Sequence, residues 1–342
     1  MAGETCAGEG GMKRAGLTPK HSGFPRLFAS PEGRLAVITV VVFLAMSALS
    51  PHGFLSLSNM TSMAFQFPEF AILALAMTVT MLTGGIDLSV VGIANLSAII
   101  AAMILTRVTG SGDGGAVLLL AMAAALCVGM VAGVFNGVLV ALLGLPAILA
   151  TLGSGLIFTG IAIALTGGSA MMGFPPATAW IGNTTVLGIP APLILFAVLA
   201  VAISLLLTHT GFGIKLRMYG ANPLAARFAA INIDAMLIKT YVLSGALASI
   251  AGMVVMSRAN SAKADYGSSY LLLAVLIAVL GGVNPYGGYG RVIGVVLAVL
   301  SMQFLSSGLN MLGVSNFARE LIWGSLLIFV MIVNTWLARG RR

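Results

Sequence analysis

Ten long apolar runs, separated by short polar connections, constrain the fold of this 342-residue chain more than any other feature. A helix needs roughly 20 mainly apolar residues to cross a bilayer, because the hydrocarbon core is about 30 Å thick. The run at 270–282 is shorter and indicates a broken or re-entrant helix. The sequence therefore predicts an all-α polytopic membrane protein with about ten transmembrane helices, some short or broken. The runs cover residues 35–50, 63–82, 88–106, 116–143, 147–166, 190–208, 235–257, 270–282, 290–311 and 320–338.

The composition excludes a water-soluble protein. Hydrophobic residues make up 59% of the chain and charged residues 8%, and the mean hydropathy is +1.08, which a water-exposed surface cannot accommodate. The net charge of +8 does not indicate nucleic-acid binding, because the basic residues fall at the termini and in loops without interleaved aromatic residues.

The basic residues predict the orientation. The polar connection at 209–234 carries Lys215, Arg217 and Arg227, and short cytoplasmic connections accumulate Lys and Arg. With a cytoplasmic N-terminus and ten spans, only four basic residues face outward. We therefore expect a flexible cytoplasmic tail at 1–34, a membrane domain at 35–338 and a cytoplasmic C-terminal end at 339–342. The four outward basic residues are Arg107, Arg258, Lys263 and Arg319.

Three apolar runs end in paired glycines, at residues 84–85, 167–168 and 281–282. Glycine adopts left-handed backbone geometry, which caps or breaks helices. Interrupted helices in transporters often mark the transport path. The alternative is that each pair is an ordinary helix cap.

Few chemical groups suggest catalysis or ion coupling. Among nine acidic residues, only Glu69 and Asp87 come near membrane depth, whereas a proton-coupled carrier usually keeps an ionisable residue in mid-span. The sequence has no HExxH, paired-cysteine or GxSxG motif, and no lysine lies in a Gly-Lys-Ser/Thr phosphate loop. We therefore expect no enzyme activity and no bound cofactor; any ATP would be hydrolysed by another subunit.

Four parts of the sequence resemble one transporter family. TGGIDLSV at 83–90 resembles the TGGIDLSVG signature of permeases of bacterial ABC importers for monosaccharides, which include the ribose, xylose, arabinose and autoinducer 2 systems. GANPLAAR at 220–227, followed by Ile231-Asn232, resembles that family's GxNxxAARxxGIN segment. Further similar stretches are VFNGVLV at 134–140, LPAILATLG at 145–153, and VLGGV at 279–283 with GGYG at 287–290.

The resemblance, which covers about residues 60–335, implies a type II ABC importer-like permease of the bacterial inner membrane. Its partners would be a second permease, two cytoplasmic ATPase subunits that hold ATP and Mg²⁺, and a periplasmic sugar-binding protein. The solute could be a pentose, a deoxyhexose, a polyol or the furanose-like autoinducer. Two positions depart from the family's pattern: Ala230 replaces a common Gly, and Leu271 replaces a frequent Glu. The second departure leaves open whether the partner permease is identical or paralogous.

The central polar connection is predicted to couple the permease to its ATPase. Residues 220–227 would form a short cytoplasmic helix, with Asn222 as N-cap and Pro223 at the first helical position. The alternative is a solvated loop whose basic residues only set the topology. The residues assigned to coupling are Gly220, Asn222, Ala225, Ala226 and Arg227.

Asp87 is predicted to cap the third span by accepting backbone N–H bonds from Ser89 or Val90. A direct contact with the sugar is the alternative. The residues assigned to the helix breaks and signature stretches are Gly84, Gly85, Asp87, Gly281 and Gly282.

Sugar passage requires small and weakly hydrogen-bonding groups, because tight binding would trap the solute. Each polar residue in a span could equally form an interhelical hydrogen bond. The uncharged connection at 168–189, which contains Trp180, is a candidate outer gate and docking surface for the binding protein, or a passive connector. The candidate path residues are Asn95, Asn136, Gln303 and Asn310, together with Thr78 and Thr80.

An ABC importer permease is the leading interpretation of these patterns. An ion-gradient-driven secondary transporter of a small polar solute is the alternative, because about ten helices with breaks suit that class too. A purely structural membrane protein fits less well, because it has no need for three glycine breaks.

Overall fold

The computed structural model describes residues 30–107 and 114–339. Most of the predicted tail at 1–34 and of the predicted C-terminal end at 339–342 therefore lies outside the described residues. The first helix, α1 (Pro31–Leu49), begins slightly before the predicted span, because Ser30 accepts a 3.0 Å bond from the Gly33 amide and Pro31 occupies the first helical position.

Ten helices correspond to the ten predicted runs. Eight helices of the described chain are long and apolar enough to cross a membrane. Helix α12 has only 11 residues, which confirms that the eighth run is short. After α1, the series continues with α3 (Leu57–Met81), α4 (Val90–Arg107), α5 (Gly114–Ala141), α6 (Ala147–Thr166), α8 (Ala191–His209), α11 (Ile233–Ala259), α12 (Tyr270–Leu280), α13 (Val292–Met311) and α14 (Asn316–Arg339).

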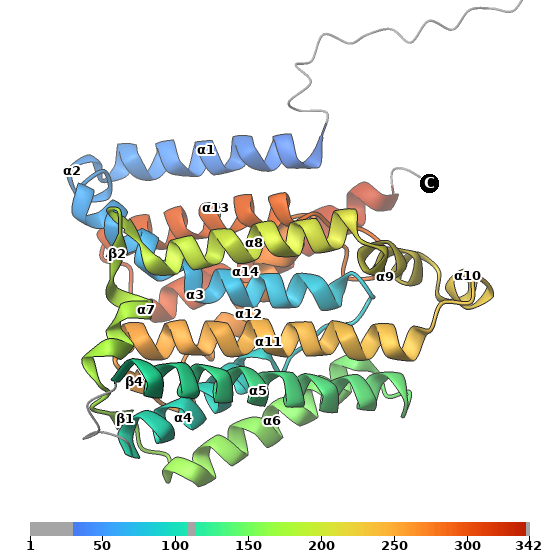
Figure 1. The fold of residues 1–342 in the computed structure, drawn as a ribbon. Coiled ribbons are helices and arrows are strands. Elements are labelled where there is room, and N and C mark those ends of the chain that lie inside the picture. Colours follow the sequence, from blue (N-terminus) through green and yellow to red (C-terminus); the bar gives the residue numbers. More distant parts are fainter. Residues whose placement is uncertain (1–29, 108–113, 340–342) are drawn as a thin grey trace, which may run out of the picture.

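The short elements gather at the two ends of the bundle (Figure 1). One end, called the β end here, holds α2 (Pro51–Phe54), the 3-10 turn η2 (Pro176–Thr178), α7 (Ala179–Asn183) and two small antiparallel sheets. The opposite end, called the α10 end, holds α9 (Gly211–Ala221), α10 (Pro223–Phe228), the start of α1 and the end of α14. The sheets pair β1 (Met171–Met172) with β4 (Ser261–Ala262), and β2 (Thr185–Val186) with β3 (Ile189–Pro190).

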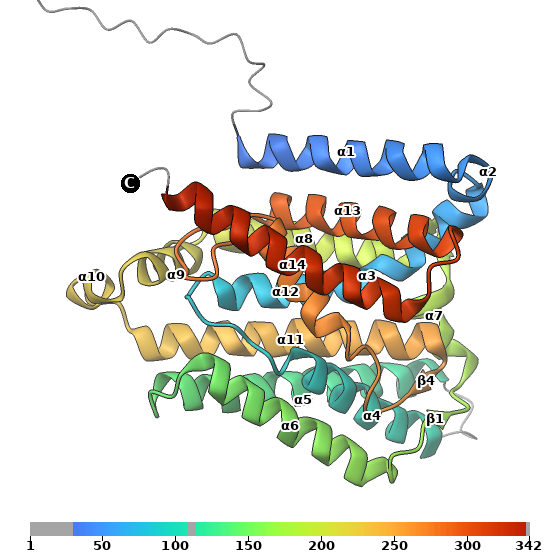
Figure 2. The same ribbon diagram turned by 180° about the vertical axis from the view of Figure 1, so that it is seen from behind.

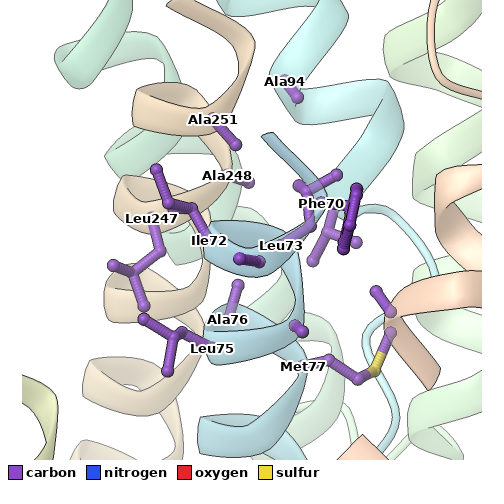
Figure 3. Close-up of a cluster of buried hydrophobic side chains, with 14 of the residues drawn as sticks. Phe70, Ile72, Leu73, Leu75, Ala76, Met77, Ala94, Leu247, Ala248 and Ala251 are labelled. Atoms are coloured by element: carbon purple, nitrogen blue, oxygen red, sulfur yellow. The ribbon is translucent and has the colours of Figure 1, made fainter. Parts of the chain in front are cut away.

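Helix α3 forms the centre of the bundle. In its most apolar stretch 83% of the residues are buried, against 11% in α1, so α3 is surrounded by protein while α1 is peripheral. Figure 3 shows the buried side chains of α3 beside those of α11 and α4. The labelled residues are Phe70, Ile72, Leu73, Leu75, Ala76 and Met77 of α3, Leu247, Ala248 and Ala251 of α11, and Ala94 of α4.

Glycines bring α5 and α11 into backbone contact. A Cβ atom at Gly133 would collide with the Tyr241 carbonyl oxygen, and one at Gly245 would collide with the Gly129 carbonyl oxygen. Without a hydrophobic drive between helices in lipid, such close packing is a main source of helix association. The many glycines of this chain thus act at helix contacts as well as at breaks.

Candidate functional site

Three distant segments meet through their backbones at the α10 end. We call residues 82–85, 220–221 and 286–288 the glycine junction. The Gly288 amide donates to the Leu82 carbonyl oxygen at 3.0 Å. A Cβ at Gly220 would collide with that same carbonyl, and a Cβ at Gly287 would lie 2.7 Å from the Gly84 nitrogen. Side chains would separate these segments, so glycine is required there.

In each of the three pairs, at least one glycine has the predicted left-handed backbone geometry. Gly84 has φ +78° and Gly282 has φ +82°, and both glycines at 167–168 have positive φ. Gly281 is right-handed, with φ −66°. Only glycine adopts positive φ without steric cost, which explains why the breaks fall at these residues.

The central connection contains two helices where one was predicted. Helix α9 extends to Ala221, so Gly220 lies in α9 and contributes to the glycine junction, and only α10 occupies the predicted short helix. Asn222 separates the two helices: its backbone is extended, with φ −156°, because a residue before proline disfavours the helical region. Its side chain accepts a 3.0 Å bond from the Ala225 amide, and Pro223 is the first helical residue, as predicted.

Helix α10 presents apolar side chains to the surroundings. Leu224 is 63% exposed and Phe228 is 85% exposed, while Ala226 is buried and both Ala225 and Arg227 are exposed. Figures 1 and 2 show α10 projecting beyond the ends of the spanning helices. An exposed apolar surface of this kind is typical of a protein contact.

Asp87 is fully buried in what we call the Asp87 cluster. One carboxylate oxygen accepts bonds from the Ser89 amide at 3.0 Å and the Ser89 hydroxyl at 2.6 Å. The other accepts from the Ser244 hydroxyl of α11 at 2.7 Å. Asn136 of α5 donates to the Ser89 hydroxyl oxygen at 2.7 Å. The predicted Ser89 bond is therefore present. Asp87 also joins the segment before α4 to α11, and Ser89 joins it to α5.

Thr151 of α6 holds the same segment from another side. Its hydroxyl oxygen accepts a 3.0 Å bond from the Leu88 amide, and the hydroxyl lies 2.8 Å from the Ala147 carbonyl oxygen as a donor. The stretches at 83–90, 134–140 and 145–153, each of which resembles a family motif, therefore meet in space. Sequence reasoning found these motifs singly, because no periodicity indicates which helices they bring together.

A second carboxylate, Glu69, lies near the middle of α3 and is 1% exposed. The Arg258 guanidinium forms an ion pair with it through Nε, and Nη2 donates to Oε2 at 3.2 Å. The Tyr270 hydroxyl donates to the same oxygen at 3.0 Å. We call these three residues the Glu69 cluster. Sequence reasoning placed Glu69 near membrane depth but did not find Arg258 as its partner, because the two lie 189 positions apart.

The remaining path candidates do not share one partner. Asn95 is buried and donates to the Ala264 and Tyr266 carbonyl oxygens, at 2.9 Å each. Gln303 is buried in α13, whereas Asn310 is exposed near the end of that helix. Thr78 and Thr80 are buried and donate to carbonyls of their own helix. Their assignment to the path stays a prediction.

The connection at 168–189 is fastened to the end of α11. The Gly182 amide donates to the Ser257 hydroxyl oxygen at 2.7 Å, and that hydroxyl donates to the Thr178 carbonyl oxygen at 2.5 Å. Strand β1 of the same connection pairs with β4, which directly follows α11. Trp180 is 60% exposed on this surface. The connection is thus a fixed cover next to Arg258.

Two of the comparisons with known proteins found matches to this chain. The family model described as "Branched-chain amino acid transport system / permease component" matches residues 59–333. The autoinducer 2 import system permease protein LsrD of Enterobacter sp. (strain 638) is 44% identical over 161 residues, which cover 47% of this chain and 49% of that protein. LsrD of Escherichia coli (strain K12) is 36% identical over 177 residues, covering 49% of this chain and 54% of that protein.

The matched part of the chain thus spans about half the length of these curated relatives. No solved structure matches. The family model, however, covers most of the chain, including the glycine junction, both carboxylate clusters and α10. This chain therefore belongs to the family that is described as the permease component of the branched-chain amino acid transport system.

Proposed function

We propose that this chain is the membrane permease of an ATP-binding cassette importer, and that it carries a monosaccharide or a related small polyol or furanose. The observation that carries the proposal is α10, which presents exposed Leu224 and Phe228 and lies next to the glycine junction through α9. A separate ATPase would hold ATP and Mg²⁺ and bind this helix. The names of the autoinducer 2 import permeases support a furanose-like solute.

The α10 end is the cytoplasmic end in this proposal. It carries Lys215, Arg217 and Arg227 on α9 and α10, and Lys239 near the start of α11. Basic residues near the ends of spans favour the cytoplasmic side. The start of α1 and the end of α14 would then face the cytoplasm of a bacterium, and the β end would face the periplasm.

The contacts suggest how movement of an ATPase would reach the transport path. Displacement of α10 would pass to α9, and Gly220 of α9 touches the backbone at Leu82. The chain from Leu82 leads within a few residues to Asp87, which is bonded to Ser89 and Ser244. Since packed contacts of this kind shift between discrete arrangements instead of deforming continuously, a small movement of α10 would reposition the start of α4.

The binding protein and the second permease would contact other surfaces of this chain. A periplasmic binding protein would dock on the connection at 168–189, where Trp180 is exposed. A second permease, either identical or paralogous, would complete the path. This chain's own part is to bind the ATPase, line the path and transmit movement.

Purification of the tagged chain from its native membrane in mild detergent tests the importer class. Mass spectrometry should identify a P-loop ATPase that copurifies with the chain, and any paralogous permease. The opposite result is a chain that purifies alone and accumulates sugar in vesicles under an ion gradient without ATP, which would establish a secondary transporter.

A substitution in α10 tests the coupling role. Ala225 is exposed and contributes its amide to the Asn222 cap, so Ala225→Glu adds bulk and charge to the surface of α10 without filling the bundle. We expect at least a tenfold loss of solute uptake while the chain remains in the membrane. Ala225→Ser is the matched control and should retain uptake. Equal uptake by both variants would show that α10 does not couple the ATPase.

A further inference from the structure

We propose that the connection between α11 and α12, residues 260–269, lines a water-filled vestibule that opens at the β end. The Glu69 cluster lies at the inner limit of this vestibule and binds hydroxyl groups of the passing solute. The proposal deepens the proposed function and rests on it for the identity of the solute. The vestibule itself follows from the depth, exposure and charge of the connection.

Helix α12 is too short to cross a membrane by itself. Helix α12 has 11 residues and rises about 16 Å at 1.5 Å per residue, which is about half of a hydrocarbon core of about 30 Å. The preceding connection contains strand β4 and turns, so non-helical backbone completes this span. Such backbone at membrane depth is tolerated only where protein buries it or where it lines a water-filled cavity.

Contacts with α3 and α4 show how deep the connection lies. Asn95 holds the carbonyls of Ala264 and Tyr266, and it lies 12 residues before α4 ends at Arg107, or about 18 Å at the helical rise. Glu69 holds Tyr270 and lies 12 residues after α3 begins at Leu57, which is again about 18 Å. Both helices have these ends at the β end. The connection therefore reaches well below the ends of α3 and α4.

Charged side chains of the connection are exposed at that depth. Lys263 and Asp265 form a 3.0 Å ion pair, yet their side chains are 38% and 64% exposed. Ser268 is also exposed. Charged side chains inside a membrane face the bundle interior or a water-filled cavity, because contact with lipid is costly. The exposed side of this connection therefore faces water.

The two charged members of the Glu69 cluster differ in their exposure. The Glu69 side chain is 2% exposed, whereas the Arg258 side chain is 33% exposed. The covered carboxylate neutralises the guanidinium, which has five N–H donors and uses two of them on Glu69. The ion pair as a whole therefore has no net charge, and its accessible part is a hydrogen-bond donor. Such a group suits the hydroxyls of a neutral sugar or polyol and does not retain ions.

Thiol labelling tests the vestibule, and the chain contains a matched control. Cys127 is exposed on α5 and lies 13 residues from Gly114, where α5 begins at the β end, or about 20 Å at the helical rise. It thus offers an exposed thiol at similar depth on a different helix. One variant keeps Cys127 alone, because the second cysteine of the sequence, Cys6, is replaced by serine (C6S). The other carries Ser268→Cys with C6S and C127S.

Intact cells that express each full-length variant with its native partners are treated with a charged, membrane-impermeant methanethiosulfonate. We expect labelling of Ser268→Cys at least tenfold faster than labelling of Cys127, because the reagent reacts with thiolates in water and not in lipid. Equal rates, or no labelling of Ser268→Cys, would overturn the vestibule. ATP-dependent uptake of autoinducer 2 by the C6S, C127S background tests the proposed function separately, since that result does not depend on labelling.

Discussion

The two carboxylates buried among the helices, Asp87 and Glu69, are stabilised in opposite ways. Asp87 accepts bonds from two serine hydroxyls and one amide, whereas Glu69 faces the arginine of an ion pair and a tyrosine hydroxyl. The donors of Asp87 belong to buried residues, Ser89 and Ser244, but Arg258 remains partly exposed. Enclosure by neutral donors is typical of a structural joint. A charged partner that reaches an open space is typical of a group that meets water or solute.

The positions of the two clusters match this difference. The Asp87 cluster follows the glycine junction at the α10 end, where α9 and α10 attach. The Glu69 cluster lies beside the end of α11, where the connection at 168–189 is fastened. One carboxylate thus serves the part of the molecule that would receive movement from an ATPase. The other serves the part that would receive the solute.

Removal of the Glu69 carboxylate should have the largest effect. Glu69→Ala leaves Arg258 without its partner. Breaking a buried ion pair by removing one member costs about 3–5 kcal/mol, and the partial exposure of Arg258 puts this pair at the lower end of that range. We expect a strong loss of folded protein, measured as the fraction that stays monodisperse in detergent after heating. The double variant Glu69→Gln/Arg258→Gln should recover much of that loss, because no unpaired charge remains. A double variant no more stable than Glu69→Ala would show that the charge is not the source of the loss.

Removal of the Asp87 carboxylate should have a smaller effect that depends on hydrogen bonding instead of charge. Asp87→Ala leaves the Ser244 hydroxyl without its acceptor, at a cost of about 1–3 kcal/mol for a buried group, whereas the Ser89 hydroxyl keeps its bond from Asn136. Asp87→Asn retains an acceptor oxygen and should be tolerated, with thermal stability and uptake within about twofold of the wild type. Equal damage from both substitutions would show that the cluster requires the negative charge, and the contrast with Glu69 would then disappear.

The smallest effect is expected from Tyr270→Phe. This change removes one of the three hydrogen bonds that Glu69 accepts and keeps the ring that packs against Phe70 with centroids 5.9 Å apart. We expect the KM for uptake to rise several-fold while the amount of folded protein changes little. Thr240→Val is a suitable control, because Thr240 is buried and bonds only within α11 among the contacts described. A changed maximal rate with an unchanged KM would place Tyr270 outside the solute's path.

The sequence predicted the spans and the cap of α10 because both depend on local patterns. Each span needs a long apolar run, and Asn222-Pro223 carries its own capping chemistry. The short α12 was visible as a short run for the same reason. Gly220 lies in α9 and not in the predicted short helix, because that helix begins only after the Asn222 cap. The part of Gly220 in coupling stays a prediction.

The tertiary contacts of the two clusters could not be predicted from one sequence. Ser244 lies 157 positions from Asp87, and Arg258 lies 189 positions from Glu69. Neither serine nor arginine has a spacing that indicates its partner. Arg258 was placed among the outward-facing basic residues by charge counting alone, which gives the side of the membrane but not the contact.

Transport in proteoliposomes that contain the purified chain with its copurifying proteins tests whether the chain is an ATP-driven permease that is coupled through α10. Autoinducer 2 and its binding protein are supplied outside, and ATP with Mg²⁺ is trapped inside. We expect accumulation that requires trapped ATP and is lost with Ala225→Glu but not with Ala225→Ser. Accumulation that continues without ATP and follows an imposed ion gradient would contradict this expectation.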